Sequence, residues 1–137
     1  MVKLTDIVEN LEYSLYPEST ELSSLSVSDI AYNSANAGMG ILFVCLIGAR
    51  ADGHDFAAEA YRRGSRIFVC QKKLSLPADA VQLITENTRR ALAVLSAAFF
   101  GHPERKLAMI GVTGTKGKST VCEMIYHILT KNGIRAG

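Results

Sequence analysis

The segment from Gly111 to Thr120 combines residue types that bind phosphate, with the sequence Gly-Val-Thr-Gly-Thr-Lys-Gly-Lys-Ser-Thr. Glycines let several backbone N–H groups approach one anion, and the start of a following helix adds partial positive charge. In this pattern Lys118 reaches the terminal phosphates, and the Ser119 hydroxyl helps to hold Mg²⁺. The segment therefore predicts a site for a nucleoside triphosphate and Mg²⁺.

The spacing departs from the usual phosphate-loop pattern at one position. That pattern has a glycine where Val112 stands, whereas here glycines occupy positions 111 and 114. An ordinary glycine-rich turn with a chance lysine is the alternative, and the flanking segments argue against it. The apolar run over 107–112 predicts a buried strand before the loop, and the apolar spacing over 121–131 predicts a helix after it.

The rest of the chain alternates between strand and helix patterns, which is typical of an α/β layer architecture. Predicted strands cover residues 30–32, 41–46, 67–70 and 81–85. Three helices are predicted, each from a capping residue and apolar spacing: Thr5 to about Leu11, Asp55 to Arg63, and a helix beginning at Asn87. Residues 12–26 are polar and rich in serine, and they predict an irregular connection.

Composition excludes several classes of protein. The chain is 48% hydrophobic and 20% charged, as expected of a soluble globular protein, and its scattered charges sum to +2. This balance argues against nucleic acid or a membrane surface as a partner. No apolar run approaches the roughly 20 residues that span a bilayer, and no signal peptide is visible, so we expect a cytoplasmic protein. Cys45, Cys70 and Cys122 are expected to be buried, reduced thiols.

Several segments together resemble one family. The phosphate loop with its displaced glycine resembles the ATP loop of the Mur ligases. The segments Asn87-Thr-Arg-Arg-Ala-Leu and Phe99-Phe-Gly-His-Pro103 resemble the region before that loop in UDP-N-acetylmuramoyl-tripeptide synthetases, the MurE type. Three further segments resemble the uridine-nucleotide domain of these enzymes: Tyr32-Asn33-Ser34, Gly40 to Gly48, and Asp52-Gly-His-Asp-Phe56. The resemblance covers nearly the whole chain.

The resemblance implies a fold and a domain organisation. Residues 1–86 would form a small mixed-sheet domain that binds the UDP substrate. Residues 87–137 would supply the first strand, phosphate loop and helix of a parallel-sheet ATPase domain. One strand and one helix cannot bury the faces of such a sheet, so we expect this domain to be truncated and the chain to be an N-terminal fragment.

The implied activity is that of an ATP-dependent amide-bond ligase of peptidoglycan precursor synthesis. ATP would phosphorylate the D-glutamate carboxylate of UDP-N-acetylmuramoyl-L-alanyl-D-glutamate. The amine of a diamino acid would then displace phosphate from the acyl phosphate. The expected partners are therefore small molecules, namely ATP, the UDP-muramoyl-peptide and an amino acid. The fragment is expected to be inactive alone.

The resemblance also implies individual roles. Lys118 would neutralise charge during phosphoryl transfer, and Ser119 would be the metal ligand. The residues implied to cradle the ATP phosphates are Gly114, Thr115, Lys116, Gly117, Lys118, Ser119 and Thr120. The residues implied to contact the uridine nucleotide are Tyr32, Ser34, Ala49, Arg50 and Ala51. From residue type alone, without the resemblance, Ser34 is predicted to be a turn residue and Arg50 a solvated cation in a loop. Arg89 and Arg90 are expected on a solvated helix face or in a domain contact.

Three positions depart from the family pattern. Asn33 and Ala35 stand where the family usually has aspartate and arginine, and Ile41 stands where it favours aspartate. Two alternatives therefore stay open. One is the related ligase that adds the terminal dipeptide to the UDP-muramoyl-tripeptide. The other is a non-catalytic nucleotide-binding paralogue.

Overall fold

The computed structural model describes all 137 residues, which form two compact units, Met1–Pro103 and Glu104–Gly137. The first unit contains every β-strand, and the second contains one long helix and most of a 3-10 turn, η4 (Pro103–Lys106). The first unit continues beyond residue 86, because helix α3 (Thr88–Phe99) belongs to it. The division into a substrate domain over 1–86 and an ATPase domain over 87–137 stays a prediction.

The first unit is built around a five-stranded mixed sheet in the order β2-β7-β6-β5-β4. The four strands β4, β5, β6 and β7 are parallel, and β2 pairs antiparallel with β7. Their bounds are Ser14–Tyr16 for β2, Asp29–Ala31 for β4, Ile41–Val44 for β5, Ile67–Cys70 for β6 and Val81–Ile84 for β7. Two short strands, β1 (Val2–Lys3) and β3 (Ser26–Val27), form a separate antiparallel pair. The prediction of an α/β fold with a mixed sheet is confirmed.

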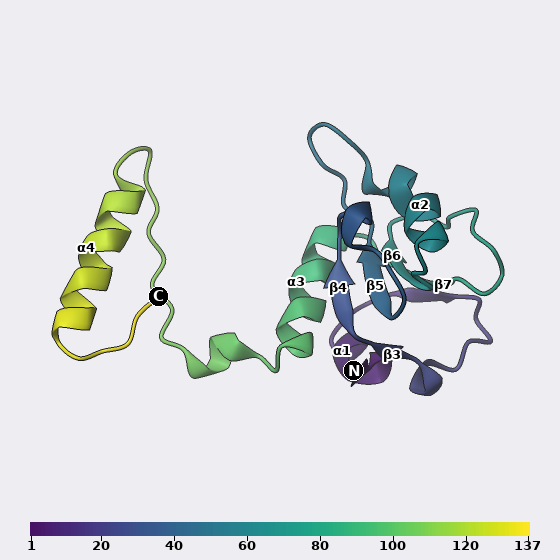
Figure 1. Ribbon diagram of the computed structural model, residues 1–137, viewed down its shortest axis with the longest axis horizontal. Helices are drawn as coiled ribbons and strands as arrows, with labels where there is room; N and C mark the ends of the chain where they lie inside the picture. Colours follow the sequence, from purple (N-terminus) through teal and green to yellow (C-terminus); the bar gives the residue numbers. More distant parts are fainter. The chain divides into compact units, whose positions relative to one another are not determined.

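Both faces of the central strands are buried, which explains their continuous apolar sequence. Along β5, Leu42 and Val44 pack into one hydrophobic cluster and Phe43 packs into another. The first cluster includes side chains of α1 (Leu4–Val8) and α3, and the second includes those of α2 (Ala57–Arg62). Figure 1 accordingly shows α2 and α3 on opposite sides of the strands. The sheet is therefore the middle layer of three.

Helix α3 forms as its sequence predicts. The Asn87 side chain accepts a hydrogen bond of 2.9 Å from the backbone N–H of Arg90, which caps the helix. Ala91 and Leu95 face the core and are fully buried. The capping residue and the apolar face that the sequence indicated are both confirmed.

Other predicted details of the first unit are wrong. Thr5 lies inside α1 and bonds Asp6, and no side chain caps that helix. The segment 12–26 was expected to be irregular, yet it contains β2, which is stabilised by pairing with β7 rather than by its own polar sequence. The cap after β5 is Asp52 rather than Asp55. The Asp52 carboxylate accepts a hydrogen bond from the His54 N–H. This bond caps the 3-10 turn η3 (Gly53–Phe56), which leads into α2.

In the second unit, α4 (Lys118–Lys131) forms, but the strand predicted over 107–112 does not. Leu107, Met109 and Ile110 are each at least 60% exposed, and no other strand pairs with this segment. A strand needs a hydrogen-bonding neighbour, and this unit offers none. The apolar side chains of α4, whose spacing predicted the helix, are consequently exposed or half-buried. The helix borders a hollow of about 690 Å³ within the unit.

The cysteines fall into two groups, all with free thiols. Cys45 and Cys70 are fully buried as expected, whereas Cys122 is exposed on α4, so that part of the prediction is wrong. Burial raises the pKa of both buried thiols, that of Cys70 to about 11. No helix combines the length and the apolar character that a bilayer crossing requires.

Candidate nucleotide-binding site

The phosphate loop leads directly into the N-terminus of α4. Gly117 precedes the helix with φ of +76°, a left-handed conformation that glycine adopts without a Cβ penalty. No side chain caps this helix, and its first turn contains no acidic residue. The first N–H groups of a helix have no partner inside it, so they are available to bind an anion. The local geometry therefore fits the phosphates of a nucleotide.

Lys118 is held against the same loop. Its ammonium group donates a hydrogen bond of 2.7 Å to the carbonyl oxygen of Gly114. This bond keeps the positive charge over the glycine turn, where an anion would meet both the ammonium and the helix N-terminus. Lys116 adds a second exposed positive charge nearby in the sequence.

The metal prediction depends on Ser119, which lies in the first turn of α4 and is exposed. No group of three or more His, Cys, Asp or Glu side chains in the chain is placed to hold a metal ion. A hydroxyl is a suitable oxygen ligand for Mg²⁺, which commonly keeps waters and phosphate oxygens as its other ligands. Ser119 thus fits a Mg²⁺ ion that is held mainly by a nucleotide.

The second predicted group gathers at the carboxyl edge of the sheet. Tyr32 directly follows β4, and Ala49, Arg50 and Ala51 lie in the loop after β5. Because β4 and β5 are adjacent and parallel, their carboxyl ends lie at the same edge, where α/β sheets present ligands. Tyr32 is 61% exposed there. The fold therefore brings both predicted segments to one edge of the sheet.

The loop after β5 is a small hairpin, which we call the β5 hairpin and define as residues 46–53. Its base is a bridge between Ile47 and Asp52, and the Gly48 N–H bonds the Ala51 carbonyl at 2.9 Å. The Gly53 N–H bonds the Leu46 carbonyl at 2.7 Å. The three predicted contact residues, 49–51, are exposed at its tip.

The base of the β5 hairpin is tied to β6 through a buried histidine. The Gln71 N–H donates to His54 Nε2 at 2.9 Å, so Nδ1 carries the proton that His54 donates to the Asp52 carboxylate. The backbone N–H of His54 and then its ring lower the pKa of Asp52, and Lys72, with its Nζ 4.0 Å from the carboxylate, lowers it further. The Asp-x-His spacing is the sequence signal for this arrangement.

Ser34 lies in the 3-10 turn η2 (Ser34–Asn36) after β4. Its hydroxyl donates to the Glu59 carboxylate at 3.3 Å, and Glu59 also pairs with Arg63 at 2.9 Å. One guanidinium nitrogen of Arg63 donates to the Ala35 carbonyl at 3.4 Å. Arg63, at the C-terminal end of α2, therefore lies beside Ala35, the position where the family usually has arginine. The Asn33 side chain caps η2 by accepting from the Ala35 N–H, a bond that aspartate would also accept.

Two further residues at this edge were not predicted as site residues. Gln71 links β6 to the segment after β7, because its side-chain amide donates to the Glu86 carbonyl at 2.7 Å. Arg89 donates to the Ile47 carbonyl at 3.1 Å and so reaches the β5 hairpin from α3. An exposed arginine or glutamine has no sequence pattern that identifies such a role, since each acts on a backbone group remote in the chain.

Comparison with known proteins identifies the family. The model of the "Mur ligase family, catalytic domain" matches residues 26–108. The UDP-N-acetylmuramoyl-L-alanyl-D-glutamate--2,6-diaminopimelate ligases of Clostridium botulinum and Bacillus licheniformis are each 36% identical to this chain. Their alignments cover 99% and 100% of the chain, but 28% and 27% of the relatives. The chain thus spans about a quarter of the length of these relatives.

Solved structures agree with this result. MurF from Acinetobacter baumannii has a TM-score of 0.75 and 25% identity, covering 95% of this chain and 28% of its own. MurF ligase from Thermotoga maritima, solved in complex with ADP, has a TM-score of 0.57 and 31% identity over 75% of this chain and 23% of its own. The chain belongs to the Mur ligase family.

Proposed function

We propose that this chain supplies the sugar-nucleotide and phosphate-binding parts of an ATP-dependent amide-bond ligase of peptidoglycan precursor synthesis. The substrate would be UDP-N-acetylmuramoyl-L-alanyl-D-glutamate, and the added group would be a diamino acid. The observation that carries the proposal is the uncapped, glycine-led N-terminus of α4 with Lys118 over it, in a chain 36% identical to ligases of that name.

The proposed reaction has two steps, each with a distinct requirement. An oxygen of the D-glutamate carboxylate attacks the γ-phosphorus of ATP, and ADP leaves. The amine then attacks the acyl carbon, and phosphate leaves as the amide bond forms. The first step concentrates negative charge on phosphate oxygens, so cations and backbone N–H groups placed there accelerate it.

The roles in that step follow from the geometry of the loop. Lys118 would transfer its ammonium hydrogen bond from the Gly114 carbonyl to a phosphate oxygen, and the N–H groups at the start of α4 would bind the same anion. Ser119 would hold Mg²⁺. The other cradle residues would be Gly114, Thr115, Lys116, Gly117 and Thr120.

The carboxyl edge of the sheet would bind the uridine nucleotide. Tyr32 offers an exposed aromatic face, the tip of the β5 hairpin (49–51) offers backbone groups and the Arg50 cation, and Ser34 offers a hydroxyl. The Ser34 proton is directed to Glu59, which leaves the hydroxyl oxygen free to accept. We place this function in the cytoplasm, where its small-molecule substrates would be met, with the substrate domain over 1–86 and the ATPase domain over 87–137.

A chimaeric enzyme tests the proposal. This chain would replace the matching 27% of the Bacillus licheniformis ligase, and phosphate release would be measured with ATP, the UDP-muramoyl-dipeptide and diaminopimelate or lysine. Substrate-dependent release that Lys118→Ala abolishes is expected. Calorimetry of the 137-residue chain with each nucleotide provides an independent measurement. A folded chimaera without release, combined with no binding of either nucleotide, would contradict the proposal.

A second candidate is the ligase that adds the terminal dipeptide. It is favoured by the MurF structures, which match at TM-scores of up to 0.75. Their identity of 25% to 31% is lower than the 34% to 43% of the diaminopimelate ligases. Binding affinities for UDP-muramoyl-dipeptide and UDP-muramoyl-tripeptide distinguish the two, because the first candidate requires preference for the dipeptide.

A third candidate is a non-catalytic nucleotide-binding paralogue. It is suggested by Asn33, Ala35 and Ile41, which depart from the family pattern. Its distinguishing result would be ATP binding without affinity for any UDP-muramoyl ligand. The Asn33 cap and the Arg63 bond to the Ala35 carbonyl support retention of the first function instead.

A further inference from the structure

We propose that Arg89 is a positioning residue for the UDP-sugar, acting through the β5 hairpin rather than by touching the ligand. The inference rests on the proposed function of that hairpin. Arg89 lies in the first turn of α3, 42 residues along the chain from the carbonyl that it binds.

The β5 hairpin is held at both sides of its base. On one side, the Arg89 guanidinium donates to the Ile47 carbonyl at 3.1 Å. On the other side, Asp52 is bonded to His54, whose ring accepts from the Gln71 N–H. Ile47 and Asp52 pair with each other, so the two attachments meet at one bridge. The tip, residues 49–51, projects from this bridge and has no attachment of its own outside the hairpin.

The backbone of Arg89 is itself fixed. The preceding residue, Thr88, is 2% exposed, and its hydroxyl lies 3.4 Å from the Gln71 side-chain oxygen. Gln71 also binds the Glu86 carbonyl, and Asn87 caps the helix. The first turn of α3 is therefore joined to the end of β6, the strand beside β5. Arg89 thus transmits the position of a rigid helix end to the hairpin.

A loop held in its binding conformation loses less conformational entropy when a ligand binds. Arg89 supplies a charge-assisted hydrogen bond to the Ile47 carbonyl, and this bond holds the free loop in that conformation. If Arg89 is removed and the β5 hairpin loses this hydrogen bond, the dissociation constant for the UDP-sugar should rise about five- to tenfold. The fold should persist, because Arg89 is exposed and contributes no side chain to the core.

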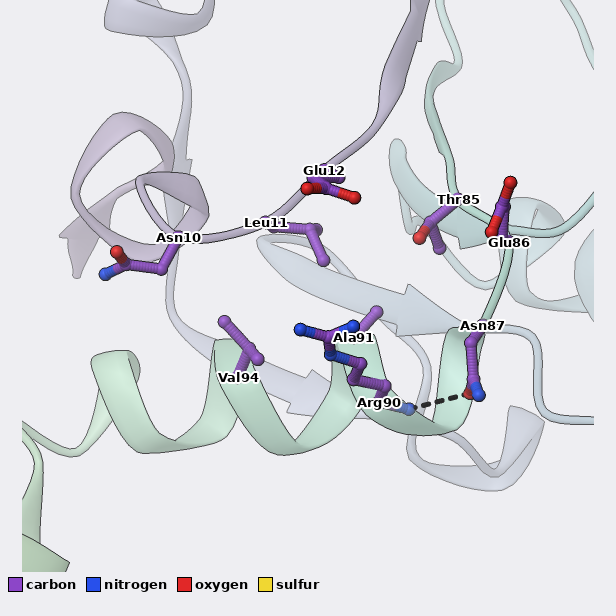
Figure 2. A pocket seen from close by; sticks show the side chains of 9 residues that line it. All are labelled: Asn10, Leu11, Glu12, Thr85, Glu86, Asn87, Arg90, Ala91 and Val94. Carbon is purple, nitrogen blue, oxygen red and sulfur yellow. Dashed lines mark hydrogen bonds between the residues drawn. The ribbon is translucent and has the colours of Figure 1, made fainter.

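The adjacent arginine provides a matched control. Arg90 lines a polar hollow of about 130 Å³ between α3 and residues 10–12, and no residue of the β5 hairpin lines this hollow. Figure 2 shows its side chain in this hollow near Leu11 and Val94. Arg89→Ala and Arg90→Ala remove the same charge from the same turn, but only Arg89→Ala removes a bond to the hairpin.

The test measures three quantities on Arg89→Ala, Arg89→Lys and Arg90→Ala in the 137-residue chain. These are the dissociation constant for UDP-N-acetylmuramoyl-L-alanyl-D-glutamate, the hydrogen-exchange rate of the Gly48 amide, and the urea midpoint. For Arg89→Ala we expect about five- to tenfold weaker binding, faster Gly48 exchange and only a small fall in the urea midpoint. Arg89→Lys should restore part of the affinity, and Arg90→Ala should match the parent chain.

Each other outcome overturns a defined claim. If the parent chain binds the UDP-sugar and the dissociation constant of Arg89→Ala lies within twofold of its value, the role of Arg89 is overturned and the proposed function stays intact. Equal weakening by Arg90→Ala also overturns it, because a loss of general positive charge would then explain the effect. Absence of UDP-sugar binding by the folded parent chain overturns both the inference and the proposed function of the sheet edge.

Discussion

The carboxyl edge of the sheet and the phosphate loop are organised by different means. At the sheet edge, each loop is tied by side chains from neighbouring elements: Arg89 and His54 tie the β5 hairpin, and Glu59 binds the turn after β4. In the phosphate loop, the bond from Lys118 to Gly114 joins residues four apart in the chain. The sheet edge is thus preformed by tertiary packing, whereas the glycine-rich loop depends on local glycine geometry and the helix terminus. The two parts should consequently respond differently to substitution.

The largest expected effect is on the folding of the first unit. A Cβ added at Gly53 would lie 2.5 Å from the Leu46 nitrogen and 2.7 Å from the Leu46 oxygen, and backbone atoms cannot yield cheaply. Gly53→Ala should lower the free energy of unfolding by about 3 kcal/mol in urea titrations. Gly38→Ala is the control, since its Cβ would meet Ile41 at an ordinary 3.8 Å. Equal stability of the two variants would show that the β5 hairpin is less constrained than its geometry indicates.

The next effect concerns the phosphate loop alone. Lys118→Ala removes a charge-assisted hydrogen bond to phosphate and should raise the dissociation constant for Mg·ATP about thirtyfold, measured by calorimetry at low salt. The unfolding of the first unit should not change. Lys131→Ala, in the last turn of α4, removes the same charge far from the loop and serves as the control. Unaltered ATP affinity in Lys118→Ala would argue against the phosphate site.

A smaller stability effect is expected at Gln82, which is fully buried in β7. Its amide accepts from the Leu74 N–H at 2.8 Å and donates to the Leu74 carbonyl at 3.1 Å, fixing the loop after β6. Gln82→Leu should cost about 2 kcal/mol by thermal or urea unfolding, because both Leu74 groups lose their partner. Asn10→Leu replaces an exposed amide and should stay within about 0.5 kcal/mol of the parent. A neutral Gln82→Leu would mean that water satisfies Leu74.

The smallest effect is a pH dependence. Hydrogen bonds from His54 lower the pKa of Asp52 in the folded chain. The resulting stability is present above the unfolded carboxyl pKa, about 3.9, and is lost as pH falls through the lower folded value. Asp52→Asn should therefore flatten the acid limb of stability below about pH 4 in urea titrations. Lys72→Ala removes the smallest of the interactions that lower the pKa of Asp52, so it should alter the acid limb less than Asp52→Asn does. An unchanged limb in Asp52→Asn would contradict the assigned cause.

Local patterns predicted much of this molecule. The buried runs at β5 and β6 fix strands because both faces of a central strand require apolar residues. The Asn87 cap and the spacing of Ala91 and Leu95 likewise fix α3. The glycine-rich motif could be recognised because its glycines and lysine lie close together in the chain, and its phosphate-binding role stays a prediction. The predicted contact residues at Tyr32 and 49–51 reach one edge because their strands are parallel neighbours.

Sequence alone determined the parallel strands β4 to β7, the helix α3 and the helix α4, since each follows from a pattern in contiguous residues. Tertiary structure alone decided three features: the pairing of β2 with β7, the lack of a strand over 107–112, and the attachments of the β5 hairpin. Each depends on a hydrogen-bonding partner remote in the chain or missing from its unit. Every residue has a backbone carbonyl, so the residue type at position 47 does not indicate that its carbonyl binds Arg89. Only the folded structure shows this bond.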